Sequence, residues 1–452
     1  MTMNESLARA LPVLEALERS GFEAVFVGGC VRDAALGRPL KDVDIASSAT
    51  PEQVMAIFAR TVPTGIRHGT VTVLHAGRQY EVTTYRKESA YERYRRPAEV
   101  EFVTELEADL QRRDFTINAM AMRPDGTVVD PFGGMRDLGR RLLRCVGDAD
   151  ARFQEDALRM IRAVRFAAEL GFRIAPATWR ALMRHGELLR HVAMERVGAE
   201  ADKMIAGASL ARAAAWLAAG GLLAKTKERL PDRLTEAAEQ FRLNRRDPEA
   251  RSLTAAALSS IAAASRLAGP DDRWAAVTDA LALKPEEALE LFGRLRFAAG
   301  RADRLAACAR VHAAMANMPE DAGGNSARCK LRELWLDTVL REGKEAAEQW
   351  LRVHFAAAET GPLQEADRQQ LRLRDKLRAW LLAMPAASVK ELAVRGSDLL
   401  ERLNAPSGPW LGELLNRLLR AAAFGETANE REALLELAER LAAAKNDRKE
   451  LP

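Results

Sequence analysis

The chain has 452 residues, more than one hydrophobic core usually holds, so we expect several domains. Its hydrophobic and charged fractions, 48% and 29%, are ordinary for a soluble globular protein, and its net charge of +4 is too small by itself to indicate a polyanionic partner. The four cysteines lie far apart, and no apolar run reaches membrane-spanning length. These features exclude a disulfide framework, a cysteine zinc site and a membrane protein, and they favour a reducing, cytoplasmic location.

The chain begins with the pattern of an amphipathic helix. Glu5, Glu15 and Glu18 interrupt its apolar positions, which is unlike a signal peptide. Up to about residue 150, short β-rich runs alternate with helical patterns and turn glycines, which predicts an α/β domain. Beyond that point nearly every segment has helical periodicity and is rich in Ala, Leu, Arg and Glu. We therefore expect an α/β region followed by an all-α remainder.

One early segment is typical of a phosphate-binding turn; residues 26–45 read FVGGCVRDAALGRPLKDVDI. Gly28 and Gly29 follow an apolar run and let the backbone come close to a ligand. The helix expected directly after them would direct N–H groups at a phosphate. Arg32 can add a positive charge at the same place.

The same segment ends in two carboxylates. In a strand, Asp42 and Asp44 would project from one face, and they would repel each other unless a cation such as Mg²⁺ lay between them. Glu81, in the hairpin pattern TVTVLHAGRQYEVTT, is the candidate third carboxylate. This arrangement suits nucleotidyl transfer by two metal ions. An isolated Asp-x-Asp is more often a loop or cap, so the segment alone leaves both interpretations open.

Three further segments decide between a metal site and an ordinary loop or cap. They read RRDFTINAMA (112–121), DPFGGMRDL (130–138) and RFQEDALRMIRAVRFAAELGF (152–172). In order and spacing they resemble the motifs of the bacterial class II CCA-adding enzymes, the tRNA nucleotidyltransferases. The likeness is dense from about residue 20 to 200 and returns near 389–425. The resemblance implies an α/β head of the polymerase-β nucleotidyltransferase type, followed by all-α neck, body and tail domains. The expected domains are 1–147 (head), 148–215 (neck), 216–330 (body) and 331–452 (tail, binding tRNA).

The resemblance also implies an activity and its residues. The activity is template-independent addition of CCA to tRNA that lacks all or part of its 3′ CCA, with CTP, ATP and Mg²⁺. Asp42 and Asp44 match the metal-binding carboxylates, and Glu81 matches the third acidic position. The triphosphate is expected to be held by Gly28, Gly29 and Arg32. The sugar and phosphates are expected to be contacted by Arg113, Asp114 and Asn118.

The EDALR motif predicts how the base is chosen. If Asp156 and Arg159 share a helix face, the carboxylate accepts from the exocyclic amine of cytosine or adenine, while the guanidinium donates to the adjacent ring nitrogen. Guanine and uracil present the opposite pattern and would be rejected. The resemblance assigns this role to the same pair, supported by Glu155, and Arg162 completes the expected nucleotide-binding set. Glu195 and Arg196, in the motif MERVGAE, are expected to have a structural role, bracing the turn that holds this helix.

Other functions stay open. A poly(A) polymerase shares the head motifs, but TGIRHGTVTV resembles the CCA-adding form of this strand and no basic tail follows. The segment at 85–103 resembles the family's flexible loop, which enzymes that add only CC are expected to lack. This disfavours an enzyme that adds only CC but leaves open one that adds only A. A helical RNA-binding or interaction scaffold with a degenerate head is disfavoured because every expected carboxylate is present. The six histidines are scattered and show no His-Asp dyad of an attached phosphohydrolase.

Overall fold

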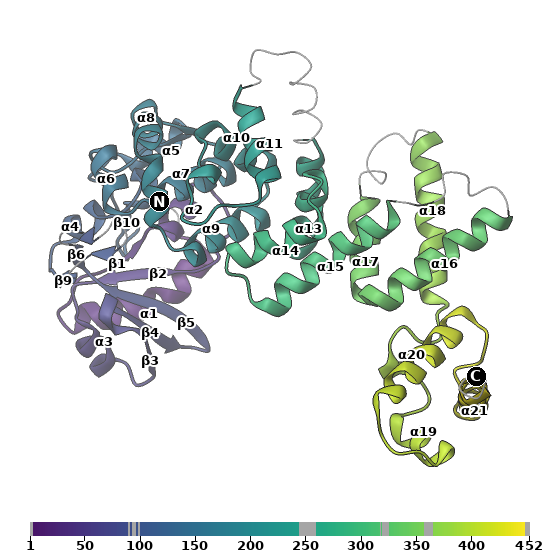
Figure 1. Cartoon of the computed structure of the whole chain (residues 1–452). Helices are drawn as coiled ribbons and strands as arrows, with labels where there is room; N and C mark the ends of the chain where they lie inside the picture. The colour runs from purple at the N-terminus through teal and green to yellow at the C-terminus, as the bar shows by residue number, and fades with distance from the viewer. Residues whose placement is uncertain are drawn as a thin grey trace. The chain divides into compact units, whose positions relative to one another are not determined.

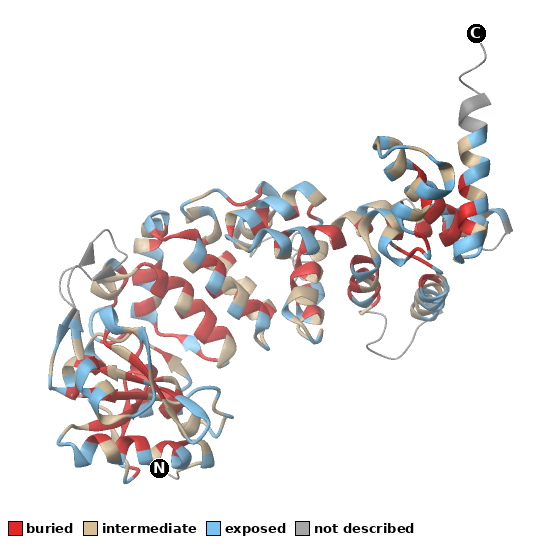
Figure 2. Cartoon of the chain, turned by 90° about the horizontal axis from the view of Figure 1, so that it is seen from below, coloured by how far each residue is buried: buried red, intermediate tan, exposed pale blue. Residues whose placement is uncertain are grey.

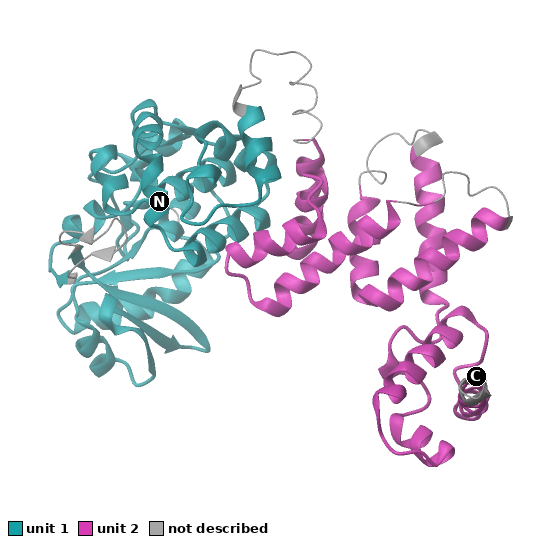
Figure 3. Cartoon of the chain, viewed as in Figure 1, with its two compact units in different colours: residues 1–254 teal, residues 255–452 magenta. Residues whose placement is uncertain are grey.

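The protein forms two compact units, residues 1–254 and 255–452, which are coloured separately in Figure 3. The computed structural model describes residues 3–88, 91–92, 96–97, 100–243, 259–316, 318, 325–356 and 365–447. Within these ranges no helix is long and apolar enough to cross a membrane.

The first unit is built around a seven-stranded sheet (Figure 1). Its strands lie in the order β11-β10-β1-β2-β5-β4-β3, and every neighbouring pair is antiparallel except β2 and β5, which run parallel. The strands are β1 (Ala24–Val27), β2 (Asp44–Ser47), β3 (Thr61–Gly65), β4 (Thr70–His75), β5 (Arg78–Thr84), β10 (Ala121–Met122) and β11 (Val128–Val129). The α/β region expected from the sequence is confirmed.

Short pairs of strands lie outside this sheet. The expected flexible loop at 85–103 has β6 (Arg86–Glu88) paired with β9 (Val100–Phe102), and β7 (Tyr91–Glu92) paired with β8 (Arg96–Pro97). Residues 89–90, 93–95 and 98–99 of that loop lie outside the described residues. A further parallel pair joins β12 (Leu142–Leu143) to β13 (Arg173–Ile174).

The first helix covers part of the sheet and confirms the expected amphipathic start. Asn4 caps α1 (Glu5–Arg19), since its side chain accepts a hydrogen bond from the Leu7 N–H. The apolar positions of α1 recur at helical spacing and pack against β1, and the buried ones are Leu7, Ala10, Val13, Leu14 and Leu17. Figure 2 shows buried residues along this helix and on the strands.

A tight hairpin sets the register of the central strands. β4 ends at His75 and β5 begins at Arg78, so the loop is Ala76-Gly77, and both residues have positive φ, 47° and 74°. Two left-handed residues are the signature of a type I′ turn, whose twist matches that of the strands. The turn therefore fixes the register of β5 against β4.

The remainder of the first unit is mostly helical. Its α7 is buried on most sides, against α9, α10 and β12. The helices after α1 are α2 (Gly29–Ala35), α3 (Pro51–Ile57), α4 (Leu106–Gln111), α5 (Gly134–Gly139), α6 (Ala149–Glu155), α7 (Leu158–Glu169), α8 (Pro176–His185), α9 (Met194–Ala206), α10 (Leu210–Gly220) and α11 (Asp232–Leu243).

The second unit is all-α in its described residues, as the sequence predicts. Two hydrophobic clusters hold it together, one around Trp335 and Trp350 and another around Leu399 and Leu418. The helices are α13 (Pro270–Ala280), α14 (Pro285–Arg294), α15 (Ala299–Met315), α16 (Asn325–Glu342), α17 (Lys344–His354), α18 (Glu365–Leu382), α19 (Gly396–Leu403), α20 (Pro409–Phe424) and α21 (Arg431–Asp447).

Substitution of Trp335 tests how much the core of this unit contributes to stability. Its side chain is fully buried, and its indole N–H donates to the Leu377 carbonyl at 2.9 Å. Trp335→Ala should lower the free energy of unfolding by about 3–5 kcal/mol, because it leaves a cavity and an unpaired carbonyl. Urea titration followed by circular dichroism measures this. Leu382→Ala is the control, since Leu382 is 64% exposed; equal losses in both variants would contradict the packing described.

Candidate active site

Two of the three predicted carboxylates are neighbours in the sheet. Asp44 is the first residue of β2, and its partner in the parallel pairing is Glu81 of β5. Paired positions on adjacent strands project to the same face of the sheet. The side chains of Asp44 and Glu81 therefore lie side by side, as predicted from sequence.

The prediction that Asp42 and Asp44 share a strand is wrong. β2 begins at Asp44, and Asp42 lies in the irregular segment before it. The cause is the end of β1: its pairing with β2 stops at Phe26, and the chain turns away at Gly28. Asp42 nevertheless lines the same cavity, of about 290 Å³, as Asp44 and Glu81.

The carboxylates are held in an environment that suits a divalent cation. Burial raises the pKa of Asp44, and the negative charges of Glu81 and Asp42 raise it further, while Arg113 opposes them. A cation among the three would remove this repulsion, and hard divalent ions prefer oxygen ligands. The donor set therefore fits a magnesium-type ion.

The predicted turn and the following helix are confirmed. α2 begins at Gly29, directly after Gly28, whose φ of 71° is a left-handed value that favours glycine. A Cβ atom at Gly28 would lie 2.8 Å from Nη1 of Arg113. Glycine at this position thus lets the Arg113 guanidinium lie against the turn.

A buried carboxylate positions Arg113. Asp109 of α4 is fully buried and accepts hydrogen bonds from Arg113 at 3.0 Å and from Arg112 at 2.6 Å. Burial alone would raise the pKa of Asp109, but the charges of Arg113 and Arg112 outweigh it and lower that pKa. Asp109 was not predicted from sequence, although an acidic residue three and four positions before two arginines, at the end of a helical pattern, is a recognisable signal.

The other predicted polar residues form one network with the helical region. Arg32 donates to Oδ1 of Asn118 at 2.7 Å, and the Asn118 amide donates to Asp114 at 3.1 Å. Arg162 of α7 donates two hydrogen bonds to the other oxygen of Asp114, at 2.7 and 2.9 Å. Burial would raise the pKa of Asp114, but Arg162 and Asn118 lower it. Four residues predicted from three separate motifs are thus directly connected.

A second buried carboxylate, also missed from sequence, extends this network. Glu200 of α9 is 3% exposed and pairs with Arg165 at 2.6 Å and with Arg162 at 3.5 Å. The ring of Phe166 lies against the guanidinium groups of Arg32, Arg162 and Arg165, within 5.3 Å of each. Arg162 and Arg165 of α7 are therefore fixed by a buried acid and an aromatic face.

The expectation that Asp156 and Arg159 share one helix is wrong. α6 ends at Glu155, Asp156 has an extended backbone, and α7 begins at Leu158. The Asp156 carboxylate accepts from the Leu158 N–H at 3.1 Å, a local bond that competes with continuing the helix. Arg159, in the first turn of α7, is instead held by Glu155 at 2.5 Å.

The expected bracing of this turn is confirmed for Arg196. From α9, its guanidinium donates to both oxygens of Asp156, at 2.7 and 3.1 Å. Arg159 also donates to the Arg112 carbonyl at 2.9 Å, which ties α7 to the segment carrying Arg113. Glu195 is exposed.

Three parts of the chain match described families. Residues 24–144 match "Poly A polymerase head domain", residues 171–228 match "Probable RNA and SrmB-binding site of polymerase A", and residues 267–438 match "tRNA nucleotidyltransferase domain 2 putative". The chain is also 40% identical over 438 residues to the CCA-adding enzyme of Geobacillus stearothermophilus, covering 96% of each chain. The protein belongs to the CCA-adding enzyme family.

Solved structures of CCA-adding enzymes have the same fold. The crystal structure of the Bacillus stearothermophilus enzyme in complex with CTP matches with a TM-score of 0.77 and 36% identity, covering 99% of this chain and all of that one. The Thermotoga maritima enzyme complexed with tRNA matches with a TM-score of 0.58 at 19% identity, over 98% and 96% of the two chains, a likeness in fold alone. The family and the α/β head followed by a helical remainder, both expected from sequence, are confirmed.

The buried acid Asp109 should make stability depend on pH. Because its pKa is lowered on folding, the unfolded chain binds a proton more readily, so Asp109 stabilises the fold above about pH 4 and less below it. Asp109→Asn should cost about 1.5–3 kcal/mol at pH 7 and make the loss of stability on acidification shallower.

Thermal midpoints between pH 3 and 7 measure this effect. Glu107→Gln, at an exposed position of the same helix, is the matched control and should follow the unmodified protein. Parallel pH curves for Asp109→Asn and the unmodified protein would contradict the assigned pairing.

Proposed function

We propose that this protein adds CCA to the 3′ end of tRNA from CTP and ATP. The observation that carries the proposal is the convergence of Asp42, Asp44 and Glu81 on one cavity, in a chain of the CCA-adding enzyme family. In each step the terminal hydroxyl of the tRNA attacks the α-phosphorus of the nucleotide. The bond to the β-phosphate then breaks, and diphosphate leaves.

Asp42 and Asp44 would hold Mg²⁺, with Glu81 as the third carboxylate. Bound there, Mg²⁺ would neutralise charge on the attacking and leaving oxygens. The protein's own part is to keep these carboxylates together, which the pairing of Asp44 with Glu81 supports. The raised pKa of Asp44 is consistent with a site that gains from a cation.

The nucleotide would lie between the turn and the arginine network. Gly28, Gly29 and Arg32 would take its triphosphate, and the close approach of Arg113 to Gly28 supports a second guanidinium contact there. The sugar and phosphates would be contacted by Arg113, Asp114 and Asn118. Because Asp114 is already bonded to Asn118 and Arg162, its carboxylate is oriented before the nucleotide arrives.

Base choice would belong to Asp156 and Arg159. The aspartate accepts from the amine of cytosine or adenine, and the arginine donates to the ring nitrogen beside it. Arg196 holds the Asp156 side chain and Glu155 holds the Arg159 side chain, so the protein itself orients both without a nucleic acid template. Uracil and guanine would leave polar groups unpaired, which is costly in a closed site.

We assign the reaction to the cytoplasm, and the four domains expected from sequence to head, neck, body and tail roles. The body and tail would follow the tRNA backbone through arginines, which gives affinity without sequence readout. The reducing location accords with four cysteines that are free thiols.

Incubation with three tRNA transcripts tests the proposed function. They end before the first C, after CC, and after the complete CCA, and each is given Mg²⁺ with CTP, ATP or both. Growth of the shortest transcript by CCA, and none of the complete one, is expected. Extension of the CC-ended transcript alone would indicate an A-adding enzyme, and long A tails on unrelated RNA a poly(A) polymerase.

Removing a metal ligand should abolish transfer. Asp44→Asn and Asp42→Asn are each expected to lower the rate of CTP incorporation by about 10³-fold or more, while the fold persists. Single-turnover assays on the shortest transcript measure this. Glu52→Gln, on the exposed side of α3, is the control in the same domain. Near-normal turnover in either aspartate variant would overturn the carboxylate assignment.

Removing a base contact should relax selectivity. Arg159→Ala is expected to raise incorporation of UTP relative to CTP by about 10-fold or more, with little change in tRNA affinity. Competition assays with the four nucleotides and filter binding of tRNA measure the two effects. Arg180→Ala, at an exposed position of α8, is the matched control. A variant with unchanged discrimination would refute the role of Arg159.

A further inference from the structure

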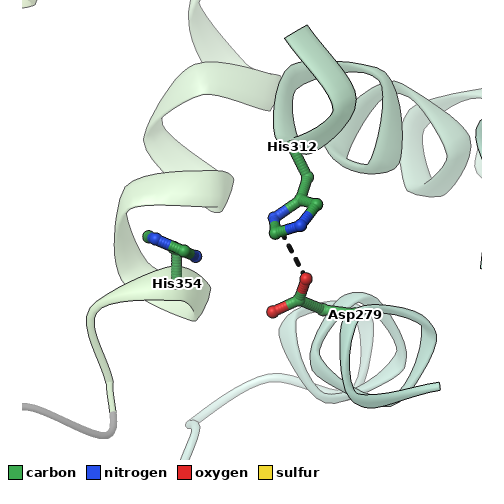
Figure 4. A group of neighbouring side chains, drawn as sticks. All are labelled: Asp279, His312 and His354. Atoms are coloured by element: carbon green, nitrogen blue, oxygen red, sulfur yellow. Dashed lines mark ion pairs between the residues drawn. The ribbon is translucent and has the colours of Figure 1, made fainter. Parts of the chain in front are cut away.

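Three side chains that could hold a metal ion meet in the second unit, which lacks the carboxylate site described above. Asp279 comes from α13, His312 from α15 and His354 from the end of α17. One ligand atom of each lies within 4.8 Å of the other two. Figure 4 shows the His312 ring directed at Asp279, with an edge of the His354 ring facing them.

The helices that carry these residues are rigidly packed. α13, α15 and α17 contact one another in all three pairings and share the core that contains Ala275, Val311 and Trp350. A site on packed helices keeps its geometry better than a site on loops. The packing of the three helices therefore determines the positions of Asp279, His312 and His354.

Trp350 orients both histidines. Its indole N–H donates to Nδ1 of His312 at 3.3 Å, and the ring of His354 stacks on it at 4.7 Å with an angle of 13°. Phe355 packs edge-on against His354, with ring centroids 4.9 Å apart. A stacked ring keeps its nitrogens at the edge, where they can bind an ion.

The contacts of His312 favour a cation. Its Nδ1 lies 3.0 Å from an oxygen of Asp279 and also accepts the Trp350 proton. This nitrogen has either a proton for Asp279 or one lone pair for Trp350, and a cation bound through that lone pair would bridge Nδ1 and the carboxylate in place of the 3.3 Å contact with Trp350. In a tetrahedral zinc site, ligand atoms lie roughly 3.3 Å apart, given bonds of about 2.0–2.1 Å. The separation from Asp279 is already close to that value.

The ligand types select the metal. Two imidazoles and one carboxylate suit Zn²⁺, unlike the all-carboxylate set of the head, which suits a hard ion. Side chains of His312 and Asp279 are 40% and 32% exposed, which leaves a path from solvent.

We propose that Asp279, His312 and His354 bind one Zn²⁺ ion that fastens α13, α15 and α17 together. Three protein ligands leave a fourth position for water. The site is independent of the proposed nucleotide chemistry, because it needs none of the head residues.

Zinc content of the full-length protein tests this. The chain is stripped with a chelator and dialysed against Zn²⁺ with excess Mg²⁺, which occupies the head carboxylates. We expect one zinc per chain in the unmodified protein and none in His354→Phe, which keeps the ring stacked on Trp350 and so preserves packing. Asp279→Asn should also lose the ion. His75→Gln, at the end of β4, is the control that should retain it.

Two further readouts keep the test decisive. Zn²⁺ should raise the thermal midpoint of the unmodified protein and leave that of His354→Phe unchanged. Co²⁺ in place of zinc should give the visible spectrum of nitrogen and oxygen ligands. Absence of bound zinc in the unmodified protein, or full zinc content in His354→Phe, would overturn the proposal. A thiolate absorption band would do so too, by assigning the ion to the exposed Cys329.

Discussion

The parallel pairing of Asp44 with Glu81 is the constraint on which the head depends. It occurs in a sheet that is otherwise antiparallel, and the two-residue turn at Ala76-Gly77 fixes the register of β5 against β4 on its other side. Because side chains alternate along a strand, a slip of one residue would send Glu81 to the opposite face. The register therefore places the half-buried carboxylate of Asp44 beside the exposed one of Glu81, and a cation bound between them would relieve their repulsion.

Around this pair, the protein uses buried acids to place arginines. Asp109 holds Arg113 beside the Gly28 turn, and Glu200 holds the arginines of α7. Each acid is shielded from water, so removing it would take away the ion pair that positions its arginines. The result is a set of cations oriented before any triphosphate binds, which is how an enzyme lowers the cost of orientation during reaction.

The sequence predicted the parts of this site that depend on local pattern. The hairpin, the Gly28 turn and the helical remainder follow from turn chemistry and periodicity. The errors at Asp42 and Asp156 have one cause, since each lies where an element ends for reasons of tertiary pairing or capping. Asp109 and Glu200 were missed because burial is not visible in a single sequence. The residues of the Asp279 cluster come from three helices that are distant in sequence, so no local pattern indicates that they meet. The domain boundaries expected at residues 147, 215 and 330 stay predictions.

The central claim is that one nucleotide site, which combines the head residues with Asp156 and Arg159, serves both CTP and ATP. Equilibrium dialysis of labelled CTP with the full chain and Mg²⁺, in competition with unlabelled nucleotides, tests it most directly. The account predicts one CTP per chain, displaced completely by ATP and far less by UTP or GTP at equal concentration. Two independent sites, or equal displacement by all four nucleotides, would contradict it.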